Sequence, residues 1–577
     1  MGISHIKSHH FVSPNPYPLN PHLYLLMSIN LINSSRDVLF SILRDVSGMK
    51  ALLLDPYTSS VVSHVASQSE IIAEQVFLVK RLSSPCSEPL HHLKALVFIS
   101  PTPESITCLC EELKQPMFSS YSIVLTSDLS DDVIKEIALA DTSSVVTSLR
   151  SYYLNFCPIT PHTAYSTLSH LKLLPSETSQ ASSLLTSLLI ALGSPASIRY
   201  IKDSDLTRTI ASSCHSQLRQ HKDLLNKSSL TQVLVMDRKE DPVSPVVLPW
   251  TYHAMIGEFS SSFINNRAVI RKDGEEKEYV FSTFNDSFFE NHRNSSFGDV
   301  GVATHDLVCE FSKQQSSAKA LNSIEDIQSF VESLPEFRTQ KTTMTKHVAM
   351  VSYLAKVVED RMLMDLGEVE QSFLASHGHS NRELIDWLKR SKISDNDKLR
   401  LLVMLNIKDP SFELPTEISE SCPFLVTAND KIKSFISNRQ LDLFKSRNLL
   451  AKAHSVVRKQ VKGVANVYAQ YQPMIANLVD QVRNRNLKES VWPFVDGQHS
   501  TEKPSILVVL IVGGISLLEA QYIEEFNSQN NGFQIILVGT SLLNSKSFLE
   551  SIVQPDSSSG PLSLAHGAIN KMFSFFS

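Results

Sequence analysis

Three carboxylates gather at the end of an apolar run, and they are the first side chains in this sequence that could do chemistry. Asp237, Glu240 and Asp241 follow the β-branched stretch 233–236, which predicts a buried strand. Acidic side chains at the carboxyl end of a strand can hold a metal ion or a phosphoryl group in an α/β enzyme. Under this interpretation Asp237 and Asp241 would serve a phosphoryl-transfer reaction.

The same corner can instead join two parts of the chain. Pro242 and Pro245 forbid a regular helix and stiffen the backbone, which suits a junction better than a catalytic loop. Asp237 and Arg238 would then pair with neighbours and fix the direction in which the chain leaves the strand. We favour this interpretation, in which the residues of the domain junction are Asp237, Arg238, Asp241 and Pro242.

Other motifs give no support for an enzyme. Gly513-Gly514 stands between a predicted strand and a predicted helix, but neither Gly-x-Gly-x-x-Gly nor Gly-Lys-Ser/Thr occurs. A Gly-x-Ser-x-Gly elbow is also absent from the sequence. The histidines of His91-His92 and His377-Gly-His379 have no further ligand at a useful spacing. We therefore expect no catalytic residue, no metal ion and no cofactor.

Composition limits the remaining classes of function. A chain of 577 residues, of which 42% are hydrophobic, is too long for one core and suggests about three or four domains. The net charge of −6 argues against nucleic acid as the main partner. Seven cysteines, an odd number without metal-type spacing, indicate reduced cytosolic thiols.

No stretch of the sequence has the length and apolar content of a transmembrane segment. Residues 1–26 are rich in proline and lack the apolar core of a signal peptide, so we expect a disordered leader. The expectation is a soluble, cytoplasmic monomer that reaches membranes only through its partners.

The N-terminal part of the chain predicts a parallel sheet. Short apolar runs alternate with segments of helical periodicity, which is the pattern of a doubly wound α/β unit. The expected strands are residues 49–55, 76–78, 94–99, 121–125 and 152–156.

A helical block interrupts a second sheet. Residues 304–490 have helical periodicity and no convincing strand, whereas strand signals return at 505–512 and 534–539 around a helical stretch. The last strands should therefore complete a sheet that begins before residue 250.

One short helix carries more apolar residues than a single buried face requires. On the helix predicted at 130–146 these residues are Ile134, Ile137, Ala138 and Val145. They could form a small groove for a partner, and ordinary core packing is the alternative.

A second candidate binding surface lies within residues 327–364, which read as two helical runs interrupted at 333–338. Pro335 breaks the helical pattern, and Leu334 and Phe337 beside it are apolar in a polar setting. An exposed apolar tip usually marks a partner surface or a movable element. A plain turn between helices is the alternative.

The acidic corner also carries a family resemblance. Leu234-Val-Met-Asp-Arg-Lys-Glu-Asp-Pro-Val-Ser-Pro245 and Trp250-Thr-Tyr-His-Ala-Met255 are similar to the signature of the SM family, the syntaxin-binding regulators of SNARE-mediated membrane fusion. Supporting stretches follow in the same order along most of the chain, among them Ser67-Gln-Ser-Glu-Ile71, Lys346-His-Val348 and Lys462-Gly-Val-Ala-Asn-Val-Tyr468.

The resemblance implies a fold of class α/β plus α. Two parallel-sheet α/β domains and an inserted helical domain would form a three-domain arch. Domain 1 would comprise residues 27–157, domain 2 residues 158–250 and 490–577, and domain 3, with a protruding hairpin, residues 251–489.

The resemblance also implies a non-enzymatic function in vesicle fusion and protein transport. The chain would hold a syntaxin-type SNARE between domains 1 and 3, and template or protect SNARE complex assembly. The residues of the templating hairpin tip would be Leu334, Pro335 and Phe337. Those of a domain 1 pocket for the N-terminal syntaxin peptide would be Ile134, Ile137, Ala138 and Val145.

Peripheral association with endosomal and trans-Golgi membranes through SNAREs is the expected location. An SM protein of another compartment (Golgi, vacuole or plasma membrane), the phosphoryl-transfer enzyme and a membrane-tethering scaffold without SNARE specificity are the alternatives.

Overall fold

The computed structural model describes most of the chain. The described residues are 29–84, 88–169, 171–225, 230–272, 274–284, 286–319, 324–375, 381–436, 471–495, 503–529 and 532–553, with only the backbone described at 272, 314–319, 324–336 and 375. The expected leader at 1–26 lies outside them.

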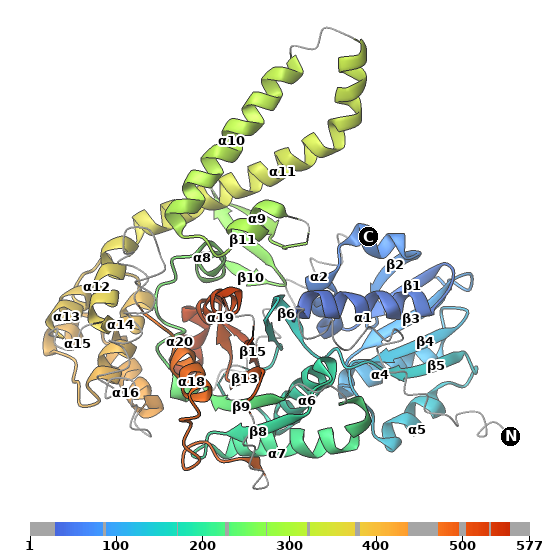
Figure 1. Ribbon diagram of the computed structural model, residues 1–577, viewed down its shortest axis with the longest axis horizontal. Helices are drawn as coiled ribbons and strands as arrows, with labels where there is room; N and C mark the ends of the chain where they lie inside the picture. Colours follow the sequence, from blue (N-terminus) through green and yellow to red (C-terminus); the bar gives the residue numbers. More distant parts are fainter. Residues whose placement is uncertain are drawn as a thin grey trace.

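Five parallel strands form what we call the N-terminal sheet, in the order β2-β1-β3-β4-β5 (Figure 1). Leu52 and Leu54 of β1 belong to the core on one face, whereas Ala51 and Leu53 belong to the core on the other. Helices thus cover both faces, which is why this strand is apolar throughout. The elements are α1 (Leu31–Asp45), β1 (Lys50–Leu54), α2 (Pro56–Val65), α3 (Gln68–Ala73), β2 (Val76–Arg81), β3 (Lys94–Ile99), α4 (Pro103–Lys114), β4 (Tyr121–Leu125), α5 (Asp131–Ala140) and β5 (Val146–Ser151).

The helix predicted at 130–146 is too long, and the strand predicted at 152–156 is misplaced. α5 ends at Ala140, and the Asp141 carboxylate accepts hydrogen bonds from the N–H groups of Val145 (2.9 Å) and Val146 (3.1 Å). This turn reverses the chain, so the β-branched residues that follow pair with β4 as the edge strand β5.

Six strands from both ends of the chain form the central sheet, in the order β6-β7-β15-β13-β9-β8. β13 pairs in parallel with β9 on one side and β15 on the other, which confirms that the last strands complete an earlier sheet. The elements are β6 (Cys157–Thr160), β7 (Thr163–Tyr165), α6 (Pro175–Leu192), β8 (Ala196–Tyr200), α7 (Asp205–Gln220), β9 (Thr231–Asp237), α18 (Met474–Arg483), β13 (Ile506–Val512), β14 (Ile515–Ser516), α19 (Leu517–Gln529), β15 (Gln534–Gly539) and β16 (Leu542–Leu543).

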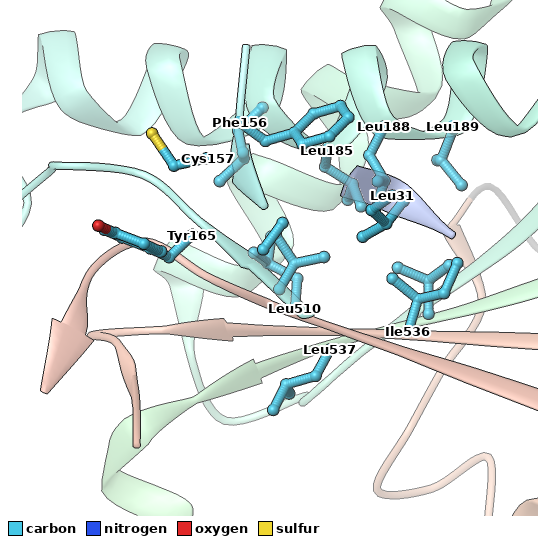
Figure 2. Packing of buried hydrophobic residues seen from close by; sticks show 14 of the residues in the cluster. Leu31, Phe156, Cys157, Tyr165, Leu185, Leu188, Leu189, Leu510, Ile536 and Leu537 are labelled. Atoms are coloured by element: carbon cyan, nitrogen blue, oxygen red, sulfur yellow. The ribbon is translucent and has the colours of Figure 1, made fainter. Parts of the chain in front are cut away.

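The core of the central sheet lies against α6. Figure 2 shows Leu185 and Leu188 on the side of the sheet where Leu510 and Ile536 point, whereas Leu537 points to the opposite side. Neighbouring residues of a strand face opposite ways, so both faces of this sheet need apolar cover. The continuous apolar runs of β13 and β15 follow from that requirement.

A mainly helical block lies between the halves of the central sheet in sequence, which confirms the predicted insertion. α10 and α11 project from the body of the molecule as a hairpin (Figure 1). The elements are α8 (Tyr252–Phe259), β10 (Ser262–Ile264), β11 (Arg267–Lys272), β12 (Glu275–Val280), α9 (Ser287–His292), α10 (Phe297–Lys319), α11 (Ile324–Asp360), α12 (Leu363–Ala375), α13 (Arg382–Leu388), α14 (Asp395–Lys408), α15 (Thr416–Ser421), α16 (Phe424–Ile436) and, near the C-terminus, α20 (Ser545–Val553).

The predicted interruption at 333–338 is wrong, because α11 runs without a break from Ile324 to Asp360 and contains Pro335. A proline inside a helix costs about 3 kcal/mol. The stacking of Phe337 on Phe311 of α10 helps to offset that cost.

No helix in the part of the chain that the structure describes has both the length and the apolar content needed to cross a bilayer.

A buried histidine joins the N-terminal unit to the central sheet. His64 of α2 donates from Nδ1 to the Ser60 carbonyl (2.7 Å), and its Nε2 lies 3.3 Å from the Tyr165 hydroxyl of β7. Burial lowers the pKa of His64 to about 4, with the Ser60 hydrogen bond opposing the shift. The ring is therefore neutral in the folded protein at neutral pH.

His64 should make the protein less stable in acid. Its folded-state pKa lies below the unfolded value, so the stabilisation is complete above about pH 6.5 and falls as the pH drops towards 4. Between pH 7 and pH 5 we expect the free energy of unfolding to fall by about 2 kcal/mol more in the wild type than in His64→Gln. Denaturant titrations at the two pH values measure this difference. The exposed His91→Gln is the control, and equal pH dependence in His64→Gln and the wild type would contradict the assignment.

Candidate functional site

The acidic corner is a buried ion cluster. The fully buried Arg238 donates from Nη1 to both carboxylate oxygens of Glu519, each at 2.9 Å, and its Nη2 lies 3.3 Å from Asp241. Asp241 also accepts from the N–H groups of Val243 (3.1 Å) and Met474 (3.2 Å). Its carboxylate is therefore fully engaged and has no surface from which to reach a substrate.

The other two corner residues are also held in place. Asp237 accepts from the Ser204 hydroxyl at 3.0 Å and from the Lys239 N–H at 3.0 Å, and Pro242 is buried. These contacts fix the end of β9 where the backbone turns into the buried segment 241–250.

That segment carries the chain from one core to another. Residues 233–236 belong to the core of the central sheet, whereas Val246 and Leu248 belong to the core of the helical block. In the block, Arg400 donates to the Val246 carbonyl (2.5 Å) and to both oxygens of Glu370 (2.6 and 2.9 Å). The geometry of the corner is thus that of a joint between two cores.

A concave site lies elsewhere, between the N-terminal unit and the base of the hairpin. A cavity of about 860 Å³ opens there, and we call it the cleft. One wall consists of α2, α3 and Val79 of β2. The other consists of the β10–β11 turn, β12, the segment after it, and residues 338–346 of α11.

A carboxylate bound by two basic side chains fixes the hairpin side of the cleft. Asp286 caps α9 by accepting from the Phe289 N–H (2.9 Å), and it binds the ammonium group of Lys346 and Nε2 of His347 (2.9 Å). Burial alone would raise the pKa of Asp286, but His347 and Lys346 lower it to about 2. Lys346 also donates to the Val280 carbonyl at 2.9 Å, so α11, β12 and α9 are held together.

Capped helices build the opposite wall. α3 begins with a capping box in which Ser67 and Glu70 bond each other's backbone N–H groups. Arg36 of α1 donates to Glu70 at 2.6 Å and, with Glu70's hydrogen bonds to Ser67, lowers the pKa of that carboxyl to about 2. The same guanidinium lies 5.3 Å from the ring centroid of Phe284, which lines the other wall. This cation–π contact connects the two walls.

The predicted peptide pocket is only partly at the surface. Ile137, which is 3% exposed, packs into the core of the N-terminal sheet and is not available to a ligand. Ile134 is half-buried and Ala138 is exposed, and their spacing of four places them on one face of α5. Val145 is half-buried just before the edge strand β5. The surface candidates are thus Ile134, Ala138 and Val145.

The predicted hairpin tip residues lie inside α11. The ring of Phe337 stacks on Phe311 of α10, with centroids 4.8 Å apart and planes 25° apart, so it joins the two helices. The side chains of Leu334 and Pro335 lie outside the described residues.

The family resemblance implied a cleft between domains 1 and 3, but the sequence assigned no residues to its walls. Ser67–Ile71 and Lys346–Val348 carried part of that resemblance, and nothing in the sequence placed them on opposite sides of one cleft. Residues 338–346 could have indicated a binding surface. This part of the helix is rich in threonine and basic residues and has no apolar stripe.

Two α/β sheets with an inserted helical block and a protruding hairpin around a cleft define a three-domain, arch-shaped binding protein. A family model described as the Sec1 family matches residues 50–551. The vacuolar protein sorting-associated protein 45 of Dictyostelium discoideum is 32% identical over 558 residues, which cover 92% of this chain and 99% of that protein. The chain belongs to the Sec1 family.

Solved structures agree with this assignment. The SM protein Vps45 in complex with the Qa SNARE Tlg2 (1–310) has a TM-score of 0.82 at 27% identity, over 92% of this chain and 100% of that one. The Unc18–syntaxin 1 complex from Monosiga brevicollis, at 17% identity and a TM-score of 0.73 over 92% of this chain, shows the same fold. The protein is an SM-type regulator of vesicle-mediated protein transport.

Proposed function

We propose that this chain binds a Qa-type SNARE and regulates SNARE complex assembly in traffic between endosomes and the trans-Golgi network, without catalysing a reaction. The observation that carries the proposal is the similarity over 92% of the chain to a Vps45 that was solved with the Qa SNARE Tlg2. The protein would act in the cytoplasm and reach Golgi and endosomal membranes through its SNARE.

The cleft supports this proposal, because its two walls come from the units proposed as domain 1 (27–157) and domain 3 (251–489). Domain 2 (158–250 and 490–577) would join them through the buried corner. A SNARE held between the walls would contact α2 and α3 on one side and α11 on the other.

The hairpin would template SNARE assembly along its helices. The backbone of α11 is one continuous helix from the cleft outward, since it is unbroken at Pro335. Leu334, Pro335 and Phe337 would act from within this helix, and Phe337 would do so by fixing α11 against α10.

A second contact would capture the N-terminal SNARE peptide on domain 1. Ile134, Ala138 and Val145 would supply its apolar surface, and Ile137 would support them from beneath. Burying one apolar anchor of the peptide would contribute about 1.5–3 kcal/mol.

Ala138→Arg is expected to weaken binding of the N-terminal peptide of a Tlg2-type Qa SNARE by about tenfold or more, because a charge would occupy an apolar surface. Titration calorimetry measures the affinity. Ala138 is exposed, so the melting temperature should not change. Glu136→Arg, on the opposite exposed side of α5, is the matched control.

Unchanged peptide affinity in Ala138→Arg would remove the groove assignment. A wild-type protein that binds no Qa SNARE, whether peptide or whole cytosolic domain, would overturn the proposed function itself.

A further inference from the structure

Lys398 of α14 is a buried lysine without a carboxylate partner. The residue is 5% exposed, and its ammonium group forms no ion pair with any residue that the structure describes. Arg400, two residues further along the same helix, is also buried but donates to Glu370 and Asp397. Burying a cation without an anionic partner costs stability, so the ion pairs of α14 do not explain why a lysine occupies this position.

The ammonium group of Lys398 is directed at a thiol. Its Nζ donates to the sulfur of Cys422 at 3.3 Å, across 24 residues of sequence. Cys422 is half-buried at the end of α15, where the chain turns into α16. Reactive cysteines are typically partly exposed and lie beside a cationic group, and Cys422 has both properties. The pair therefore holds an oxidisable sulfur and a nitrogen nucleophile in contact.

Four of the other described cysteines are less suited to oxidation. Burial raises the pKa of their thiols, which are those of Cys108, Cys110, Cys157 and Cys214. A thiol held in its protonated form reacts slowly with oxidants, because the thiolate is the nucleophile. Cys309 of α10 is exposed to solvent and provides an internal comparison for oxidation of a thiol at the surface.

We propose that Cys422 and Lys398 form a peroxide-sensitive modification site, where oxidation of the thiol leads to a sulfenamide bond between the two side chains. In the first step hydrogen peroxide transfers one oxygen to the sulfur, so that Cys422 becomes a sulfenic acid and the peroxide is reduced to water. In the second step Lys398 releases one proton to solvent, and its amine forms an N–S bond to the same sulfur. The S–O bond breaks, and its oxygen leaves as water with a second proton from the nitrogen.

A small thiol reverses the modification by attacking the sulfur of the N–S bond. The amine then leaves with a proton and Cys422 becomes a mixed disulfide, from which a second thiol releases the free cysteine as the two small thiols become a disulfide. While it lasts, the bond closes a loop from α14 to the start of α16 and stabilises the helical block, as a disulfide across the same loop does. The site thus links the oxidation state of its surroundings to the rigidity of this block.

The test is oxidation of the full chain with hydrogen peroxide, with and without dimedone to trap sulfenic acids, followed by peptide mass spectrometry. In the wild type without dimedone we expect a cross-linked pair of peptides that contain Lys398 and Cys422. Its mass should lie two hydrogens below the sum of the separate peptides, and dithiothreitol should separate them. In Lys398→Arg, which keeps the charge but has no amine, the cross-link should be lost and dimedone should label Cys422 instead.

Lys392→Arg is the matched control, because it makes the same substitution at an exposed position just before α14. It should cross-link as the wild type does. Lys398→Met is a second variant without the amine, since arginine is larger than lysine and enters a buried site. Circular dichroism shows whether each variant keeps its fold, and dimedone labelling of Cys309 should be equal in all of them. The cross-link in the wild type tests the proposal even if neither variant folds.

Three results would overturn the proposal. Oxidation of Cys309 without any oxidation of Cys422 would show that peroxide does not reach the site. Equal dimedone labelling of Cys422 in the wild type and in Lys398→Arg, with no cross-link in either, would show that the amine does not trap the sulfenic acid. A cross-link from Cys422 to a different lysine would remove Lys398 from the site.

Discussion

Replacing Arg238 with methionine is expected to lower the free energy of unfolding by about 3–5 kcal/mol. Arg238 neutralises the buried Glu519, whose oxygens both accept from Nη1, and it supports Asp241. Without the guanidinium, Glu519 would be a buried carboxylate with no positive partner. Chemical denaturation followed by far-UV circular dichroism measures the loss.

The double variant Arg238→Met/Glu519→Met should regain most of that stability. It removes both members of the buried pair, and such replacements are often neutral. Asp241 would stay satisfied by backbone N–H groups. Arg208→Met, which breaks an exposed pair with Asp205, is the control and should change stability by less than about 0.5 kcal/mol. A small effect of Arg238→Met on its own would show that the ion cluster does not stabilise the joint between the two cores.

Ile137→Arg is expected to destabilise the N-terminal unit by about 4 kcal/mol or more, and so to abolish peptide binding indirectly. The side chain is 3% exposed in the core of the N-terminal sheet, where an arginine would be placed among apolar side chains. Thermal melts and soluble yield measure the effect. The sequence interpretation placed Ile137 in the pocket, where the same substitution would spare the fold.

Ala138→Arg, one residue along α5, is the matched comparison because the same side chain enters at an exposed position. For Ala138→Arg we expect a normal melting curve and weak peptide binding. For Ile137→Arg we expect the melting transition to lose its cooperativity. A wild-type melting curve for Ile137→Arg would mean that Ile137 faces the groove after all.

The strands of the two sheets were predictable because parallel sheets are covered on both faces. β1, β3, β4, β9, β13 and β15 each contain a short apolar run, and a short apolar run between helical segments is typical of a buried parallel strand. The inserted helical block was predictable for the same reason. The strand signals at 505–512 and 534–539 need a sheet to join, and the strands before residue 250 provide it.

Two secondary-structure predictions were wrong because local interactions outweighed the sequence pattern on which they depended. At 141–151 a single aspartate carboxylate ends α5 and starts β5, and apolar periodicity does not report such a hydrogen bond. At Pro335 the predicted break assumed that a proline ends a helix, whereas a helix running from Ile324 to Asp360 tolerates one.

The sequence by itself determined which residues are apolar enough to form cores, where the chain must pass between them, and which family it resembles. Only the tertiary structure decided what the polar residues do. Arg238 neutralises Glu519 across 281 residues of sequence, which turns a possible active site into a joint. The cleft likewise assembles residues from positions 59–71, 265–286 and 338–346. Polar side chains acquire a role from their partners, and distant partners leave no periodic pattern in a sequence.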